Sequence, residues 1–180
     1  MPDTRARMLD AALSALQHDG VAGMSFTEVL RRSGAARGGI YHHFPGGKVQ
    51  LVAEAAEQHA EDVRAALSTL PGTRPVAVVK AFLDDVRPVV ADSVSGGGCA
   101  IAAITVGTPA ELNEAAGRAF ATWTGALADR LESAGLRRKD AGELATTLLM
   151  LLEGAHVLCR AAGNLEPFEQ AARQALKLAR

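Results

Sequence analysis

Aromatic side chains are scarce in this sequence, and so are cysteines and long apolar runs. Phe, Tyr and Trp together make up 4% of the residues, which argues against a stacking platform for single-stranded nucleic acid. Two cysteines, Cys99 and Cys159, are too few for a disulfide framework or, by themselves, for a zinc site. The strongest apolar run, Leu148 to Leu152, is far too short to span a membrane. The N-terminal residues lack the apolar stretch of a signal peptide, so we expect a soluble, cytoplasmic protein.

An excess of one charge is also missing from the chain as a whole. The formal net charge is −1, so the protein is not a polycation. Residues 1–50 carry six Lys and Arg against four Asp and Glu, whereas residues 51–180 carry thirteen against sixteen. A modestly basic head on an acidic body permits contact with DNA at one end only.

Helix-forming apolar residues, in contrast, are plentiful. Hydrophobic residues make up 48% of the chain, strand-like alternation is missing, and Gly or Pro separates the helical stretches. These features predict an all-α protein. We expect helices that end near Gly20 and at Ser33-Gly34, then a short helix before Pro45, and a long one from about Lys48 to Leu70. Two short helices after a longer one are the layout of a helix-turn-helix.

The two short helices carry more specific signals. Ser25-Phe26-Thr27-Glu28 has the pattern of a capping box, in which Ser25 caps the helix and Glu28 reaches back to it. In the third helix we expect Ala36, Ile40 and Phe44 on one buried face, which leaves a polar face outward (Arg37, Gly38, Tyr41 and His42). Glycine costs about 1 kcal/mol of helix stability relative to alanine, but it suits a place where another surface approaches the backbone. DNA in the major groove is such a surface.

The string SFTEVLRRSGAARGGIYHHFPGGKVQL resembles the DNA-binding segment of the tetracycline-repressor (TetR) family. The PGGK turn and the later Gly98-Cys99-Ala100-Ile101 segment are similar to the LmrA/YxaF branch of that family. The resemblance implies a dimeric, all-helical repressor that holds operator DNA through residues 1–48 and a small inducer through residues 49–180. The DNA contacts that it implies are Thr27, Arg37, Gly38, Gly39, Tyr41, His42, His43 and Lys48.

Two residues of this segment depart from the family pattern. Ala36 stands where the family often has Ser, Thr or Pro, and Gly39 where it usually has Ser or Thr. Both changes remove a hydroxyl group that is able to contact phosphate. His43 either contacts phosphate or fills the end of the helix. The alternative function is a helical interaction module that has lost DNA binding. Enzyme motifs, including a nucleophile elbow and a nucleotide-binding loop, are absent from the sequence, so we do not expect an enzyme.

The C-terminal part predicts a dimer and a ligand pocket. The chain ends in an apolar helix at about 138–162 and a final amphipathic helix with small residues. Two such helices favour a four-helix interface with a second copy. The alternative is that both helices pack within one monomer. Apolar walls favour an apolar or aromatic inducer, although Phe120 and Trp123 fit a core as well as a pocket. The candidate pocket residues are Phe82, Val86, Cys99, Ile104, Phe120, Trp123, Met150, Glu153 and His156.

Within the apolar helix, Glu153, His156 and Arg160 form one polar line. Glu-x-x-His resembles half of a di-iron motif, but the sequence has no second copy, so no metal or other cofactor is predicted. We expect a mutually satisfied polar strip at the dimer seam or the domain surface, or else a group that orients a ligand.

Overall fold

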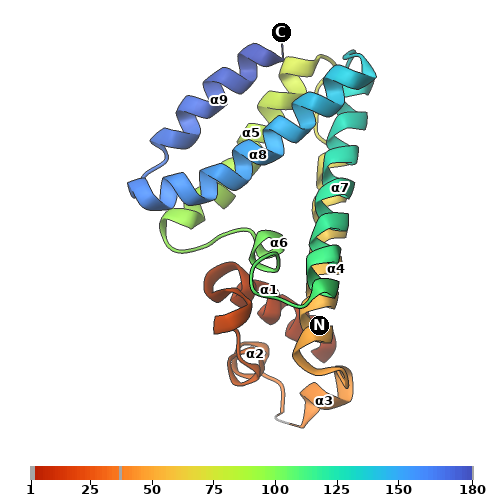
Figure 1. Cartoon of the computed structure of the whole chain (residues 1–180), viewed down its shortest axis with the longest axis vertical. Helices are drawn as coiled ribbons and strands as arrows, with labels where there is room; N and C mark the ends of the chain where they lie inside the picture. The colour runs from red at the N-terminus through yellow and green to blue at the C-terminus, as the bar shows by residue number, and fades with distance from the viewer. Residues whose placement is uncertain (1–2, 37, 180) are drawn as a thin grey trace. The chain divides into compact units, whose positions relative to one another are not determined.

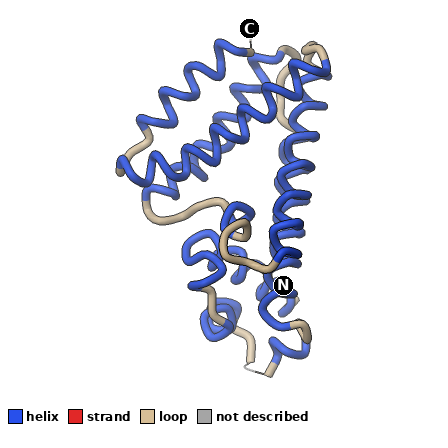
Figure 2. Tube along the Cα trace, in the orientation of Figure 1, coloured by secondary structure: helices blue, strands red, loops and turns tan. Residues whose placement is uncertain are grey.

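The computed structural model describes residues 3–36 and 38–179, and over these residues the chain forms helices and no strand (Figures 1 and 2). The predicted all-α class is therefore confirmed. In chain order the helices are α1 (Thr4–Gly23), α2 (Phe26–Ser33), α3 (Gly39–His43), α4 (Gly47–Ser68), α5 (Pro75–Val94), α6 (Ala100–Ala103), α7 (Ala110–Ser133), α8 (Arg138–Ala162) and α9 (Glu166–Leu178).

Contacts divide the chain into two compact units. Unit 1 comprises residues 1–61 and 99–119, and unit 2 comprises residues 62–98 and 120–180. Helices α4 and α7 are each divided between the two units, with one end in unit 1 and the other end in unit 2. The division into domains at residue 48 stays a prediction, and each unit is described by itself.

The core of unit 1 forms where α1 packs on α2 and α6. Met8 and Leu16 of α1, Val29 of α2, and Ile40 and Phe44 of the α3 region are each at most 1% exposed. Burying such side chains contributes about 1.5–3 kcal/mol each. Unit 1 therefore holds α2 and α3 on a fixed apolar base.

Local signals determine where the first helices end. Gly20 interrupts α1 with a φ of 64°, and the chain makes one more turn before Met24. Gly34 caps the end of α2 in the left-handed conformation, with a φ of 67°. The predicted breaks near Gly20 and at Ser33-Gly34 are thus confirmed. Ala36 is a correction, because it is exposed and precedes α3 instead of lying on its buried face.

In unit 2, α5, α8 and α9 pack against one another. The part of α7 in this unit adds Trp123, Leu127 and Leu131, all buried. The predicted helix at 138–162 is confirmed as α8. By length and composition α8 also satisfies the criteria for a membrane span, but Leu144, Leu148 and other apolar side chains belong to the core of unit 2.

Within unit 2, the other helices cover only part of the surface of α8. Met150, Val157 and Leu158 are exposed on it, as is Leu178 on α9. These four residues are called the α8–α9 apolar face below.

Candidate nucleic-acid interface

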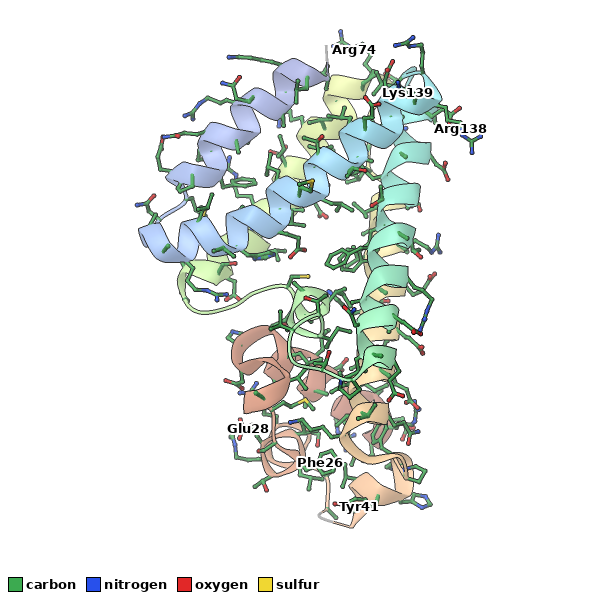
Figure 3. The ribbon with its side chains drawn as sticks, viewed as in Figure 1. Phe26, Glu28, Tyr41, Arg74, Arg138 and Lys139 are labelled. Atoms are coloured by element: carbon green, nitrogen blue, oxygen red, sulfur yellow. The ribbon has the colours of Figure 1, made fainter. Side chains whose placement is uncertain are left out.

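A groove of about 610 Å³ separates α2 from α3 at the surface of unit 1. Thr27 and Arg31, one turn apart on α2, line it together with Tyr41 of α3. Tyr41 is 65% exposed, although its ring meets the ring of Phe26 edge to face, with centroids 5.7 Å apart (Figure 3). A large, rigid and exposed aromatic side chain beside a hydroxyl and a guanidinium is well suited to contact DNA.

The rest of α3 presents a mixed surface. Gly38 and His42 are exposed, whereas His43 is half-buried. The ring of His43 contacts those of His42 and Phe44, with centroids 5.2 and 6.4 Å away. Lys48 is half-buried at the start of α4. Arg37, the remaining predicted DNA contact, lies outside the described residues.

The two glycines of this segment have different surroundings. A Cβ atom on Gly38 would meet nothing within 4 Å, so the structure leaves the space above it open. A Cβ atom on Gly39 would lie 3.3 Å from Cε of Met8. Gly39 therefore has a packing role against α1, whereas Gly38 has none and leaves room for an approaching backbone.

The N-terminus of α2 is capped on one side only. The Ser25 Oγ atom accepts a hydrogen bond of 3.2 Å from the Glu28 amide, which confirms the predicted cap. Glu28 does not reach back. Its carboxylate instead accepts bonds from Arg31 Nε at 2.8 Å, Arg31 Nη2 at 2.7 Å and Arg32 Nε at 2.6 Å. Charge-assisted bonds outcompete the neutral backbone amide for the carboxylate, and they lower the pKa of Glu28 to about 2.

Arginines of α1 and α2 secure the two short helices. Arg7 Nε donates a 3.0 Å hydrogen bond to the carbonyl oxygen of Ser33, at the end of α2. The guanidinium of Arg5 lies over the Phe44 ring, 5.2 Å from its centroid, and pairs with Glu54. Arg32 pairs with Ser14 and Asp19 of α1 as well as with Glu28. These contacts attach α2, and the Phe44 residue that follows α3, to α1.

Two family models match the chain. Residues 8–55 match the bacterial regulatory proteins of the tetR family, and residues 75–174 match the C-terminal domain of LmrA/YxaF-like transcriptional regulators. The chain belongs to the TetR family. Regulators of this family typically bind operator DNA as ligand-responsive repressors. The predicted family and branch are thus confirmed, and the chain is a transcriptional regulator, not an enzyme.

Curated relatives agree with this assignment over most of the chain. An uncharacterised HTH-type regulator of Mycobacterium tuberculosis is 31% identical over 97% of this chain and 93% of its own length. The HTH-type transcriptional regulator LmrA of Bacillus subtilis is 29% identical, with 92% of this chain and 90% of its own length covered.

Solved structures share the fold. A TetR regulator from Legionella pneumophila has a TM-score of 0.88 at 22% identity, covering 100% of this chain and 99% of that one. The TetR regulator CifR, solved as a cysteine mutant with 26-base-pair operator DNA, has a TM-score of 0.72 at 22% identity, covering 97% and 96%. Because the sequence identity is only 22% in both cases, these two structures show a shared fold and not a shared function.

The predicted ligand residues do not all belong to one unit. Cys99 and Ile104 are part of unit 1, and the other seven are part of unit 2. Phe82, Val86, Ile104, Trp123 and His156 are buried, Cys99, Phe120 and Glu153 are half-buried, and Met150 is exposed. The rings of Phe120 and Trp123 meet edge to face, with centroids 5.4 Å apart. Met150 and His156 lie on different faces of α8, since six residues separate them.

Two residues of the polar line on α8 have partners at the end of α5 or just after it. His156 is 5% exposed, and its Nδ1 atom is joined by a 2.5 Å hydrogen bond to Oγ of Ser93 on α5. Arg160 donates hydrogen bonds to the carbonyl oxygens of Ser93, at 3.4 Å, and of Gly97. His156 is therefore buried in unit 2, whereas Arg160 is exposed. A place at the dimer seam and a role in orienting a ligand stay predictions. Burial and the nearby Arg160 lower the pKa of His156, against an opposing effect of Asp92.

Arg31 is a residue that the sequence analysis missed. Its side chain is 70% exposed and lines the α2–α3 groove with Thr27 and Tyr41. The spacing of Thr27 and Arg31, four residues apart on a short helix, was the available signal, since it places both on one face.

Proposed function

We propose that this regulator represses transcription by binding operator DNA through the α2–α3 groove. The observation that carries the proposal is Tyr41, whose exposed ring stands beside Thr27 in a groove held rigid by the core of unit 1. Gly38 leaves open space for a nearby phosphate backbone. By analogy with other helix-turn-helix proteins, α3 enters the major groove and Arg37, His42, His43 and Lys48 supply further contacts.

We also propose that the α8–α9 apolar face binds a second copy of the chain. A groove of about 410 Å³ runs along this face, lined by apolar and small side chains including Met150, Leu158 and Leu178. Gly154 lines the groove, and a Cβ atom on it would meet nothing within 4 Å, so a partner helix has room to come close. A second copy fits because two heads are needed to bind two half-sites one helical turn, about 34–36 Å, apart.

For the inducer, the proposal is a small apolar or aromatic molecule that binds within unit 2. Phe82 and Trp123 are buried apolar side chains of that unit, and the Ser93–His156 pair is a buried polar group. A ligand that binds one arrangement of the helices better than the other shifts the equilibrium between them by that difference in affinity. Release of DNA follows from this shift. A regulator that binds the cell's DNA in this way acts in the cytoplasm.

Genomic capture tests the proposal. Tagged protein is mixed with sheared DNA of its own genome, the bound fragments are sequenced, and an enriched fragment is footprinted. We expect one or a few sites with two half-sites related by two-fold symmetry, and a compound from an apolar library that releases them. Uniform recovery of all fragments would contradict operator binding and favour an interaction module. A ligand that binds tightly but leaves DNA affinity unchanged would contradict the release mechanism.

A further inference from the structure

The pair formed by Glu28 and Arg31 stands at the edge of the α2–α3 groove. Arg31 donates two hydrogen bonds to the two carboxylate oxygens of Glu28, and the structure gives it no other polar partner among the described residues. Its guanidinium is therefore turned toward its own helix. Yet the side chain is 70% exposed and shares the groove with Thr27 and Tyr41.

Arg32 has the opposite character, although it shares the same carboxylate. It is tied to α1 through a 3.0 Å hydrogen bond to Ser14 Oγ and an ion pair of 3.8 Å with Asp19, and its side chain is only 30% exposed. Glu28 thus pairs with one arginine that is also bound to α1 and with one that is bound to Glu28 alone among the described residues. If Arg31 turns away, Glu28 keeps the bond to Arg32 Nε and remains charge-paired.

We propose that Arg31 binds a DNA phosphate and that Glu28 is the counter-ion this phosphate must displace, which makes Glu28 a selectivity residue of the DNA-binding surface. The inference rests on the proposed function, since it places DNA over the α2–α3 groove. An exposed ion pair contributes little to stability, so a well-placed phosphate takes the guanidinium from the carboxylate at low cost.

Selectivity follows from the difference between the two kinds of DNA complex. Non-specific complexes are held by charge alone and sample many positions, and in most of them Glu28 keeps Arg31 and repels the nearest phosphate. In the operator complex, base contacts by α3 fix the position of the DNA, and one phosphate is held where Arg31 reaches it. Glu28 therefore weakens non-specific binding more than operator binding.

The experiment compares two duplexes: the one that the wild-type protein enriches most strongly from a random-sequence pool, and its scrambled counterpart. Affinities are measured by fluorescence anisotropy over a series of salt concentrations. For Glu28→Gln, which keeps a hydrogen-bonding side chain at this position, we expect about tenfold tighter binding to the scrambled duplex and less than threefold tighter binding to the selected one. Glu114→Gln removes the same charge from an exposed site on α7 and serves as the matched control; we expect neither affinity to change by more than about twofold.

Arg31 variants show whether the effect acts through that side chain. Arg31→Ala should lower the salt slope of operator binding by about 0.9 per head, or about 1.8 for a dimer, whereas Arg31→Lys should keep the slope. The double variant Glu28→Gln/Arg31→Ala should lose the gain on scrambled DNA. A merely structural role for the pair would change thermal stability without changing the slope, so melting curves accompany each variant.

Three outcomes overturn the inference: equal gains on both duplexes for Glu28→Gln, a gain that persists in the double variant, or an unchanged salt slope for Arg31→Ala. If the wild type enriches no duplex from the pool, the proposed function fails, and this inference fails with it. Clear enrichment together with any of the three outcomes refutes the inference alone.

Discussion

Leu158→Ala removes apolar surface from the α8–α9 apolar face without touching the core of unit 2. The side chain is 59% exposed in the monomer, so most of its apolar area becomes buried only if a second copy covers the face. The substitution should weaken the dimer strongly and leave the fold of each monomer intact.

The expected magnitude follows from the exposed fraction. Shortening Leu to Ala removes three carbon groups, each with a burial free energy of about 0.8 kcal/mol. Since 59% of the side chain is exposed, about 1.4 kcal/mol per copy depends on the partner. A two-fold interface contains the residue twice, so the loss is about 2.8 kcal/mol, or about 100-fold in the dimer dissociation constant.

Sedimentation equilibrium over a range of protein concentrations measures that constant. Val106→Ala is the matched control, because Val106 is also exposed but lies in unit 1. The control should keep the wild-type dissociation constant, and circular dichroism should show the same helix content in all three proteins. A change of less than about fivefold for Leu158→Ala would refute the reasoning and place the dimer contact elsewhere.

Three further predictions concern stability, measured by urea unfolding. Burial and Arg160 lower the pKa of His156 in the folded protein below its ordinary value of 6.5. As the pH falls below 6.5, the unfolded chain therefore gains a proton on His156 before the folded chain does. The unfolding free energy should drop over this pH range. A His156→Gln variant that retains the full pH dependence would count against this cause. Gly34→Ala should cost about 1–2 kcal/mol because the φ is 67°, while Gly38→Ala, at a φ of −73° in open space, should cost nothing comparable; equal costs would contradict the argument. Ser25→Ala should cost about 1 kcal/mol through loss of the cap, and an unchanged unfolding midpoint would show that the cap contributes little.

Helix ends were predictable wherever a single residue decides them. Gly34 ends α2 because only a residue that tolerates a positive φ fits there. The helix at about 138–162 was predicted from its apolar residues, and in the structure Gly163 caps α8 in the left-handed conformation. Ala36 was misplaced because α3 begins only at Gly39, a boundary that no capping side chain marks.

Long-range partners were not predictable in the same way. The sequence shows His156 and Arg160 on one line of a helix, but Ser93, which lies 63 residues before His156, becomes a neighbour only through the packing of α5 on α8. The role of Glu28 was missed for a more local reason. Arg31 and Arg32 follow on the same helix, and these charged donors bind its carboxylate in place of the Ser25 amide.

The most direct test of the account is the affinity of Tyr41→Ala for an operator fragment recovered by genomic capture. Fluorescence anisotropy would compare it with the wild type and Val106→Ala, on the fragment and on a scrambled duplex, at two salt concentrations. We expect tight, sequence-selective, salt-weakened binding by wild type and control. For Tyr41→Ala we expect a loss of selectivity with residual salt-dependent binding. Undiminished selectivity in Tyr41→Ala would contradict the assignment of the α2–α3 groove as the DNA-binding surface.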